Sequence, residues 1–513
     1  MTFTTLRRIS LWLALLGAAG CTIAHDWPTP GSRVPPPQLP QMPDRVGWSG
    51  TLWAGPASGP PAAPRARDCQ RSTQPFDVPG PELQSMRRRG DAMADGMVDA
   101  RALAAAPRSR AESRSADASD ASVASKSAAA TGAAESAVPM FAPPLAFAPA
   151  PQAMQPSQPG ARPADEPVSA GVTDDNADFG AYLTYRSRAR QAGINVRDRD
   201  ITERYRLSVH DAAGRPVPDA LVSVHAGSTP RPLWARTDAG GEVWLHPRAA
   251  GINDAVLEVR VSKPGPGGEL QGSAWLRRGQ RDALQVRLDA NVPVDRARLD
   301  IAFLVDATGS MGDEIDKLKR SMQSVAAQIA RLPGQPDVCF ALVAYRDRGD
   351  EFFVRALDFT NDLDSLQRQL NALRAAGGGD YPEALNEALH TAVHRLSWRD
   401  DGATRLLLLV ADAPPHLDYG APWYDDDMQG ALARGIKLFT LAASGLDKSG
   451  EYIYRQLAQY TGGRFVYLTY DKAREPSSGP GRETVHDVGN YSVETLDRLV
   501  VRLVREELAR RPA

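Results

Sequence analysis

Short apolar runs alternate with amphipathic segments from Arg298 to the end of the chain, and this order restricts the fold more than any other pattern in the sequence. Nearly continuous apolar runs, of the kind found in buried parallel strands, occupy residues 301–305, 338–343, 406–410 and 436–442. The segment after the first run repeats apolar residues at intervals of three and four, which is typical of one buried helix face. The pattern predicts a doubly wound α/β fold with a mostly parallel sheet over residues 298–513.

Oxygen-bearing side chains follow two of the predicted strands, and another lies in a glycine-rich loop. Asp306, Thr308 and Ser310 come directly after the first run, Asp412 follows the third, and Asp380 ends the glycine-rich stretch. The carboxyl ends of parallel strands meet at one edge of the sheet, so we expect these side chains to lie close together. A hard cation such as Mg²⁺ takes oxygen ligands in octahedral geometry. Asp306, Thr308, Ser310 and Asp412 are therefore the candidate metal ligands.

The motif Asp306-x-Thr308-x-Ser310, with a downstream glycine-rich loop and a strand-terminal Asp412, resembles the metal-ion-dependent adhesion site of von Willebrand factor A (VWA) domains. The resemblance implies a bound Mg²⁺, or Mn²⁺ or Ca²⁺, with the two hydroxyls as direct ligands and the two carboxylates binding directly or through water. It also implies an open coordination position that the Glu or Asp of a protein partner fills. The family's second loop usually contributes a Thr, which this chain lacks there. Asp380 is the candidate replacement, and its charge would weaken the attraction for an acidic partner.

Two other functions remain open for the same loops. A degenerate domain of this kind can be a metal-free scaffold in the cell envelope, and a metal-dependent hydrolase would use the ion to activate water. The hydrolase is the weaker alternative, because only His416 and Asp380 stand where a general base is needed. The net charge of -2 and the lack of a basic stripe argue against nucleic acid. We expect a binding protein and no enzyme.

Several residues beyond the third strand are further candidates. His416, Trp423 and Tyr424 follow Asp412 closely enough to form part of a partner-binding rim. The three aspartates after Tyr424 fit better as the start of a helix, whose N-terminus favours carboxylates. His390 and His394 have the i, i+4 spacing that can hold zinc on a helix, but they lack the internal Glu of zinc proteases. We interpret these two histidines as part of a solvated helix face.

Residues 199–290 form a separate predicted domain. Short runs with alternating apolar residues are separated by turns rich in Gly and Pro, which is typical of a small antiparallel β-sandwich. The segments 209–220 and 237–243 resemble the carboxypeptidase regulatory-like (transthyretin-like) family. That resemblance implies a spacer or a ligand-presenting module.

The N-terminal segment has the features of a secretory signal. Arg7 and Arg8 precede an apolar run that ends in small residues and Cys21, which resembles a bacterial lipoprotein signal over residues 1–20. Lipidation of Cys21 would anchor the chain, and Thr22 in place of Asp favours the outer membrane. An ordinary cleaved signal is the alternative.

Pro, Ala and Ser dominate residues 21–198, which predicts a mostly disordered tether that cannot bury enough apolar surface to fold. Two further cysteines, Cys69 and Cys339, can form a disulfide in an oxidising compartment, although nothing in the sequence brings them together.

Overall fold

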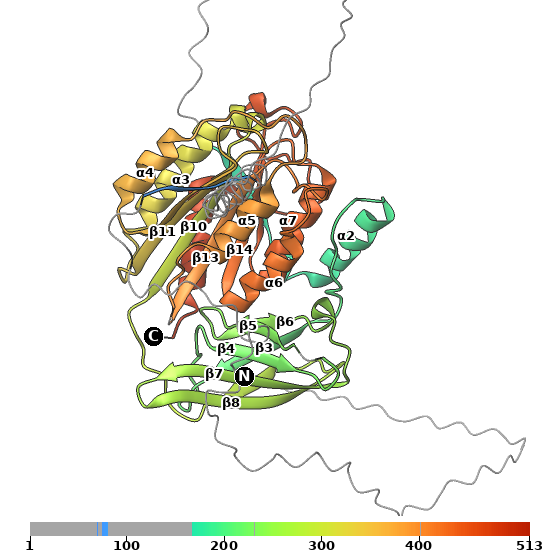
Figure 1. The fold of residues 1–513 in the computed structure, drawn as a ribbon, viewed down its shortest axis with the longest axis vertical. Helices are drawn as coiled ribbons and strands as arrows, with labels where there is room; N and C mark the ends of the chain where they lie inside the picture. The colour runs from blue at the N-terminus through green and yellow to red at the C-terminus, as the bar shows by residue number, and fades with distance from the viewer. Residues whose placement is uncertain (1–68, 70–73, 81–166, 230, 401, 513) are drawn as a thin grey trace, which may run out of the picture. The chain divides into compact units, whose positions relative to one another are not determined.

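The computed structural model describes residues 69, 74–80, 167–229, 231–400 and 402–512 (Figure 1). The predicted signal at residues 1–20, Cys21 and the larger part of the predicted tether lie outside the described residues. Within the described ranges, no helix has both the length and the apolar character needed to cross a membrane.

A mixed sheet forms the larger domain, with strand order β1-β12-β11-β10-β13-β14-β15-β2-β16 (Figure 1). Its strands are β1 (Phe76–Val78), β2 (Ser169–Thr173), β10 (Arg298–Asp306), β11 (Asp337–Tyr345), β12 (Val354–Thr360), β13 (Ala403–Ala411), β14 (Ile436–Ala442), β15 (Phe465–Thr469) and β16 (Val493–Thr495). The strands from β11 through β15 in this order run parallel, as the sequence predicts. The outer strands pair antiparallel, partly because the turn from β11 into β12 is too short for a crossover. The prediction of a mostly parallel sheet is therefore correct for the central strands and wrong for the edge strands.

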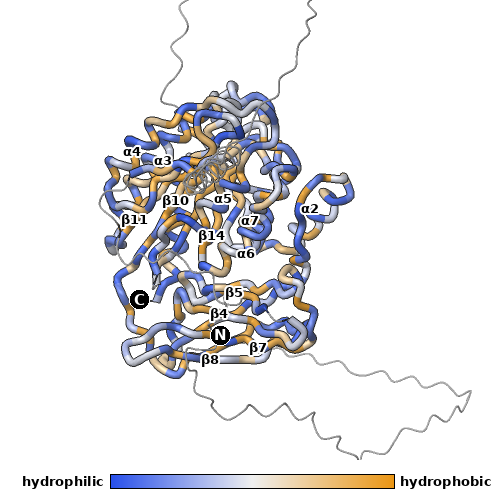
Figure 2. Tube along the Cα trace, viewed as in Figure 1, coloured by the Kyte–Doolittle hydropathy of each residue, from blue (hydrophilic) through white to orange (hydrophobic). Residues whose placement is uncertain are grey.

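Helices cover both faces of this sheet (Figure 1). One face carries α5 (Leu385–His394), α6 (Tyr424–Arg434) and α7 (Lys448–Thr461), and the other carries α3 (Ile315–Ile329), α4 (Leu363–Ala372) and α8 (Leu496–Ala509). Alternate residues of β10 enter the two cores, Leu304 on the first side and Phe303 and Val305 on the second. The central strands are accordingly apolar along most of their length (Figure 2).

The last part of the predicted tether is folded. Residues 169–173 form β2 between β15 and β16, and α2 (Phe179–Gln191) packs on α7 through Tyr182 and Tyr185. Helix α2 is largely hydrophilic, and its composition alone therefore gives little sign of burial (Figure 2). The tether prediction fails here because the partners that bury this segment come from the C-terminal part of the chain.

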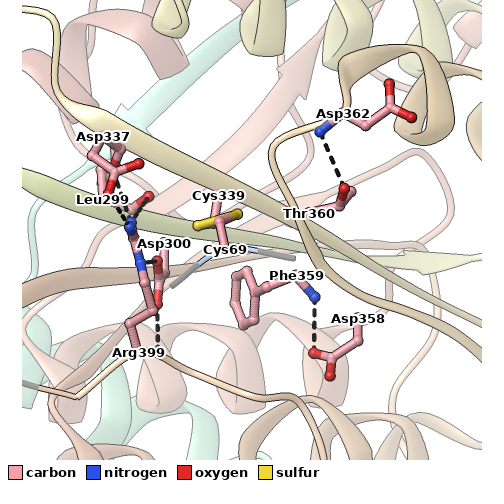
Figure 3. Close-up of a disulfide and its surroundings, with 10 residues drawn as sticks. All are labelled: Cys69, Leu299, Asp300, Asp337, Cys339, Asp358, Phe359, Thr360, Asp362 and Arg399. Carbon is pink, nitrogen blue, oxygen red and sulfur yellow. Dashed lines mark hydrogen bonds and ion pairs between the residues drawn. A yellow bond between two sulfur atoms is a disulfide. The ribbon is translucent and has the colours of Figure 1, made fainter. Parts of the chain in front are cut away.

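A disulfide joins Cys69 to Cys339 in β11, with a Cα–Cα distance of 5.8 Å (Figure 3). It fixes the segment before β1 to the sheet, and β1 then pairs with the edge strand β12. Close to the disulfide, the buried Arg399 donates from Nε to Asp300 Oδ1 at 2.7 Å (Figure 3). The sequence allowed this disulfide without predicting it.

Two smaller sheets make up the domain between β2 and β10, which we call the small β domain. One sheet has the order β6-β3-β9 and the other β5-β4-β7-β8. Their strands are β3 (Tyr205–His210), β4 (Leu221–His225), β5 (Leu233–Arg236), β6 (Glu242–Leu245), β7 (Val256–Gly265), β8 (Gly268–Arg277) and β9 (Leu284–Arg287). Every pairing is antiparallel except β3 with β9, which is parallel. The resemblance to the carboxypeptidase regulatory-like family stays a prediction.

Asp219 connects the small β domain to the large sheet. Its carboxylate accepts from Arg405 Nη1 at 2.8 Å, from Arg236 Nη1 at 3.0 Å and from the Gly402 amide at 2.7 Å. Asp219 has a φ of 54°, a left-handed conformation that Asp tolerates better than most residues. Both Asp219 and Arg405 are buried, so the junction depends on a charge pair withdrawn from water.

Candidate metal centre

The first loop begins where β10 ends. Asp306 is fully buried, and its Oδ1 accepts from the amide and the hydroxyl of Thr308 at 2.9 and 2.7 Å. Its Oδ2 accepts from the hydroxyl of Tyr345, the last residue of β11, at 3.1 Å. The carboxylate is thus held by the turn that follows its own strand and by the neighbouring strand.

The loop that follows β13, which we call the third loop, meets the first loop because β13 lies beside β10 in parallel. Asp412 directly follows β13, and its Oδ1 accepts from Ser310 Oγ at 3.0 Å. Ser310 Oγ lies 3.1 Å from Thr308 Oγ1. Four of the five predicted ligands, Asp306, Thr308, Ser310 and Asp412, therefore form one continuous hydrogen-bonded group.

The second, glycine-rich loop is fastened to the first by backbone hydrogen bonds. The Gly309 amide donates to the Gly377 carbonyl at 3.0 Å, and the Gly378 amide donates to Asp350 Oδ2 at 2.9 Å. Gly378 has a φ of +67°, and a Cβ there would lie 2.5 Å from Glu383 Oε1 and 2.9 Å from Thr308 Cβ. Glycine is therefore needed at this position, both for the backbone conformation and for the close approach.

Glu383 is the site residue that the sequence analysis missed. Its amide donates to Pro414 O at 3.0 Å, and its carbonyl accepts from the His416 amide at 3.0 Å, which fixes it against the third loop. Its side chain reaches toward Thr308, as the contacts at Gly378 show. In the sequence, Glu383 is visible as a second carboxylate in the same loop as Asp380, but nothing there shows which of the two residues faces the site.

Asp380 lies apart from the hydrogen-bonded group. Its side chain is 62% exposed and stands 3.9 Å from His416 Nε2. Asp380, Asp347 and His416 bring their ligand atoms within 4.8 Å of one another. The structure thus places Asp380 in an adjoining acidic cluster, and the carboxylate that the second loop directs toward Thr308 is Glu383.

Residues 300–415, from β10 to just beyond Asp412, match the family profile of the von Willebrand factor A domain. This range contains all three loops and the strands that position them. Residues 300–415 form a VWA domain.

Parts of the chain are similar to proteins of several organisms. The chain is 38% identical over 93 residues to human von Willebrand factor A domain-containing protein 7, which covers 18% of this chain and 10% of that protein. It is 32% identical over 124 residues to an ariadne-like RING finger protein of Acanthamoeba polyphaga mimivirus, which covers 24% of this chain and 12% of that protein. It is 25% identical over 186 residues to the alpha-protein kinase vwkA of Dictyostelium discoideum, which covers 35% of this chain and 28% of that protein. The chain thus spans 10%, 12% and 28% of the length of these three relatives.

Burial and mutual repulsion set the electrostatics of the VWA site. Burial raises the pKa of Asp306 to about 6. Burial, with the Asp306 charge, raises the pKa of Asp412 to about 7. Burial, followed by Asp306, Asp347 and Asp412, raises the pKa of Glu383 to about 9. Protons are held strongly because each carboxylate is desolvated next to others of the same charge.

The site fits a hard divalent cation. Among the residues that the structure describes, no Lys or Arg forms an ion pair with Asp306, Asp412 or Glu383. Oε2 of Glu383 is buried and has no hydrogen-bond partner in that part of the chain. The ligand atoms are all oxygens, from carboxylates and hydroxyls, which is the donor set that Mg²⁺, Mn²⁺ and Ca²⁺ prefer.

The predicted partner-binding rim is only partly where the sequence analysis put it. His416 is buried, stacks on Tyr419 at 3.6 Å between ring centroids, and pairs with Asp418 through Nδ1 at 2.9 Å. Trp423 is half-buried, and the guanidinium of Arg197 lies 4.4 Å from its ring centroid.

Tyr424 is fully buried, and its hydroxyl donates to the Arg197 carbonyl at 2.6 Å. The prediction is wrong for Tyr424, because the segment before the small β domain covers it. The three aspartates that follow lie in the first turn of α6, as predicted.

Proposed function

We propose that the VWA domain binds a divalent cation, with Mg²⁺ as the first candidate and Mn²⁺ or Ca²⁺ as alternatives, and engages a protein partner through it. VWA domains generally mediate protein–protein interaction, which supports the second half of the proposal. The observation that carries the first half is the continuous oxygen group from Asp306 to Asp412, whose negative charge no described basic residue offsets. When bound, the ion supplies a positive centre that attracts a carboxylate of the partner.

The residues have distinct roles in this proposal. Thr308 and Ser310 offer hydroxyl oxygens, and Asp306 and Asp412 offer carboxylates that neutralise the ion. Tyr345 holds Asp306 in place through its hydroxyl. This arrangement presents the ion at the carboxyl edge of the sheet, where ligands of such folds bind.

Glu383 adds a third carboxylate beside the site. An ionised Glu383 would tighten cation binding and lower the net positive charge that a partner's carboxylate meets. We therefore expect strong retention of the ion and a partner whose binding depends on contacts beyond a single acidic side chain.

Thermal unfolding of the full chain tests the metal half of the proposal. Wild type, Asp306→Asn and Asp313→Asn are compared in Mg²⁺ and in EDTA; Asp313 is an exposed carboxylate in the same loop. A ligand at 100 times its Kd stabilises the folded state by about 2.7 kcal/mol. We expect Mg²⁺ to raise the Tm of wild type and Asp313→Asn and not that of Asp306→Asn.

The opposite result would favour the alternative function, a metal-free scaffold. If no divalent ion shifts the Tm of the wild type, cation binding at this site is refuted. Should the ion bind equally well to Asp306→Asn, the ion lies elsewhere. Metal-dependent turnover of a substrate that disappears in Asp306→Asn would instead support the hydrolase and contradict a pure binding role.

We further propose that the chain is a lipid-anchored protein of the cell envelope, with Cys21 as the lipidated residue and the outer membrane as its location. The lipoprotein-like signal supports this proposal. The disulfide between Cys69 and Cys339 fits it too, because disulfides persist in oxidising compartments. Metabolic labelling with a fatty acid, followed by membrane fractionation, should label the wild type and not Cys21→Ser. Equal labelling of both would refute the anchor.

A further inference from the structure

Helices α5 and α6 bring two histidines and one aspartate to a single point outside the three loops of the VWA site. His390 Nδ1 lies 2.9 Å from Asp427 Oδ1, and His394 Nε2 lies 2.8 Å from the same oxygen. The three ligand atoms lie within 4.8 Å of one another. The imidazole rings are 4.5 Å apart between centroids.

The convergence follows from the two helices that supply the residues. His390 and His394 are four positions apart on α5 and therefore face the same way. Asp427 belongs to the first turn of α6, which packs against α5. The prediction of a solvated helix face is thus wrong for His394, whose side chain is 24% exposed, while His390 keeps 44% exposure.

Asp427 provides a second observation that is independent of the histidine spacing. The residue is 3% exposed, and its Oδ2 is buried with no hydrogen-bond partner among the described residues. A buried carboxylate oxygen without a partner costs free energy. The histidines contact the other oxygen, Oδ1, so a cation bound by both oxygens of Asp427 would remove that cost.

We propose that His390, His394 and Asp427 form a binding site for a borderline-soft divalent cation of the Zn²⁺ class. Two imidazole nitrogens and one carboxylate oxygen are a known donor set for zinc, with bonds near 2.0–2.2 Å. Cu²⁺ and Ni²⁺ bind imidazole too, whereas Mg²⁺ prefers oxygen. The proposal is independent of cation binding at Asp306.

The geometry needs only a small adjustment. Ligand atoms of a tetrahedral zinc ion lie about 3.4 Å apart. Each nitrogen therefore has to move away from Asp427 Oδ1 by about 0.5 Å, starting from 2.9 and 2.8 Å. His390 is exposed enough to rotate and to admit the ion from solvent. Three protein ligands leave a fourth position for water or for a side chain of another molecule.

Arg434 opposes binding. Its Nη2 lies 3.1 Å from His394 Nδ1, and a histidine that binds a metal through Nε2 carries its proton on Nδ1. The guanidinium must therefore turn away when the ion binds. Arg434→Gln is expected to raise the affinity for Zn²⁺, whereas a site without metal function would not respond in this direction.

The test uses the full chain, stripped of metal and held in excess Mg²⁺ so that oxygen sites are filled. Zn²⁺ binding is measured by equilibrium dialysis with elemental analysis, and Co²⁺ serves as a spectroscopic probe through its visible absorption. The variants are His390→Gln, His394→Gln and Arg434→Gln. The matched controls are His210→Gln, in the small β domain, and Asp426→Asn, an exposed neighbour of Asp427.

We expect the wild type and both controls to bind one Zn²⁺ tightly and to give the Co²⁺ band. His390→Gln and His394→Gln should weaken binding at least about tenfold, since even loss of an outer partner costs that much. Circular dichroism in EDTA checks that the variants fold, and His390→Gln alters an exposed side chain. Absence of Zn²⁺ binding by the wild type in excess Mg²⁺, or equal binding by both histidine variants, would overturn the proposal.

Discussion

Asp219→Asn should destabilise the protein more than its conservative chemistry suggests. The substitution keeps the size of the side chain and the tolerance for a φ of 54°, so backbone strain does not change. It removes the negative charge that Arg405 meets at 2.8 Å and Arg236 at 3.0 Å. Arg405 has only 4% of its side chain exposed and would remain charged in a buried position.

The expected magnitude follows from that uncompensated charge. Removing one partner of a buried ion pair costs about 3–5 kcal/mol. The pH dependence gives a second signature. Burial alone would raise the pKa of Asp219, but Arg405, Arg236 and Lys263 hold it well below its usual range. A lowered acidic pKa stabilises the folded state above the unfolded pKa of about 4, and this contribution is lost as the pH falls below it.

Urea denaturation of the full chain at pH 7 measures the effect. Wild type and Asp219→Asn are compared with Asp282→Asn, which alters an exposed aspartate of the same domain. The free energy of unfolding should fall by about 3–5 kcal/mol for Asp219→Asn and by less than about 0.5 kcal/mol for the control. The difference from wild type should shrink as the pH is lowered below 4. A loss of less than about 1 kcal/mol at pH 7 would show that Arg405 is not held by this pair.

Three further predictions concern the VWA site. Gly378→Ala should destabilise the protein by about 1–3 kcal/mol in urea denaturation, because it forces a left-handed φ and a contact with Glu383; an unchanged midpoint would contradict this. Glu383→Gln should change the Tm in EDTA at pH 7 little, since a pKa of about 9 keeps Glu383 neutral there, but should reduce the Tm rise on adding Mg²⁺; a large loss in EDTA would show a structural role. In EDTA the Tm should be lower at pH 8 than at pH 5. The pKa values of Asp306 and Asp412 are raised to about 6 and 7 in the folded state, which therefore loses these protons at a higher pH than the unfolded state does. Saturating Mg²⁺ should reduce or reverse this Tm difference, since the ion binds the ionised carboxylates. An equal Tm at pH 5 and pH 8 in EDTA would refute the link between protonation of these carboxylates and stability.

The central sheet and two of the three loops could be predicted from local sequence. An unbroken apolar run before Asp306, and another before Asp412, place both residues at strand ends, and parallel pairing of β10 with β13 then brings them together. Ser310 and Thr308 follow from their spacing within the first loop. The hydrogen bonds from Thr308 to Asp306 and from Ser310 to Asp412 confirm that this group assembles.

The remainder depends on contacts between distant segments, which local patterns do not contain. Strand β2 lies in a segment of weak apolar character and is fixed by partners such as Thr469, whose carbonyl accepts from Ser169 Oγ across 300 positions. Glu383 rather than Asp380 approaches the first loop because its backbone pairs with the loop after Asp412. Tyr424 is an aromatic residue of the kind that anchors partners, but it is buried in the core and its hydroxyl donates to the carbonyl of the distant Arg197.

The bond between Cys69 and Cys339 also decides which part of the chain carries mechanical load. A pull between residues before Cys69 and a partner held at the VWA site enters the fold at β11, one strand away from the strand that ends in Asp306. After reduction the same pull falls first on β1 and then on β2, which are held by strand pairing and side-chain contacts without a covalent link to their neighbours. The disulfide therefore makes the attachment resistant to shear without adding anything to the site itself.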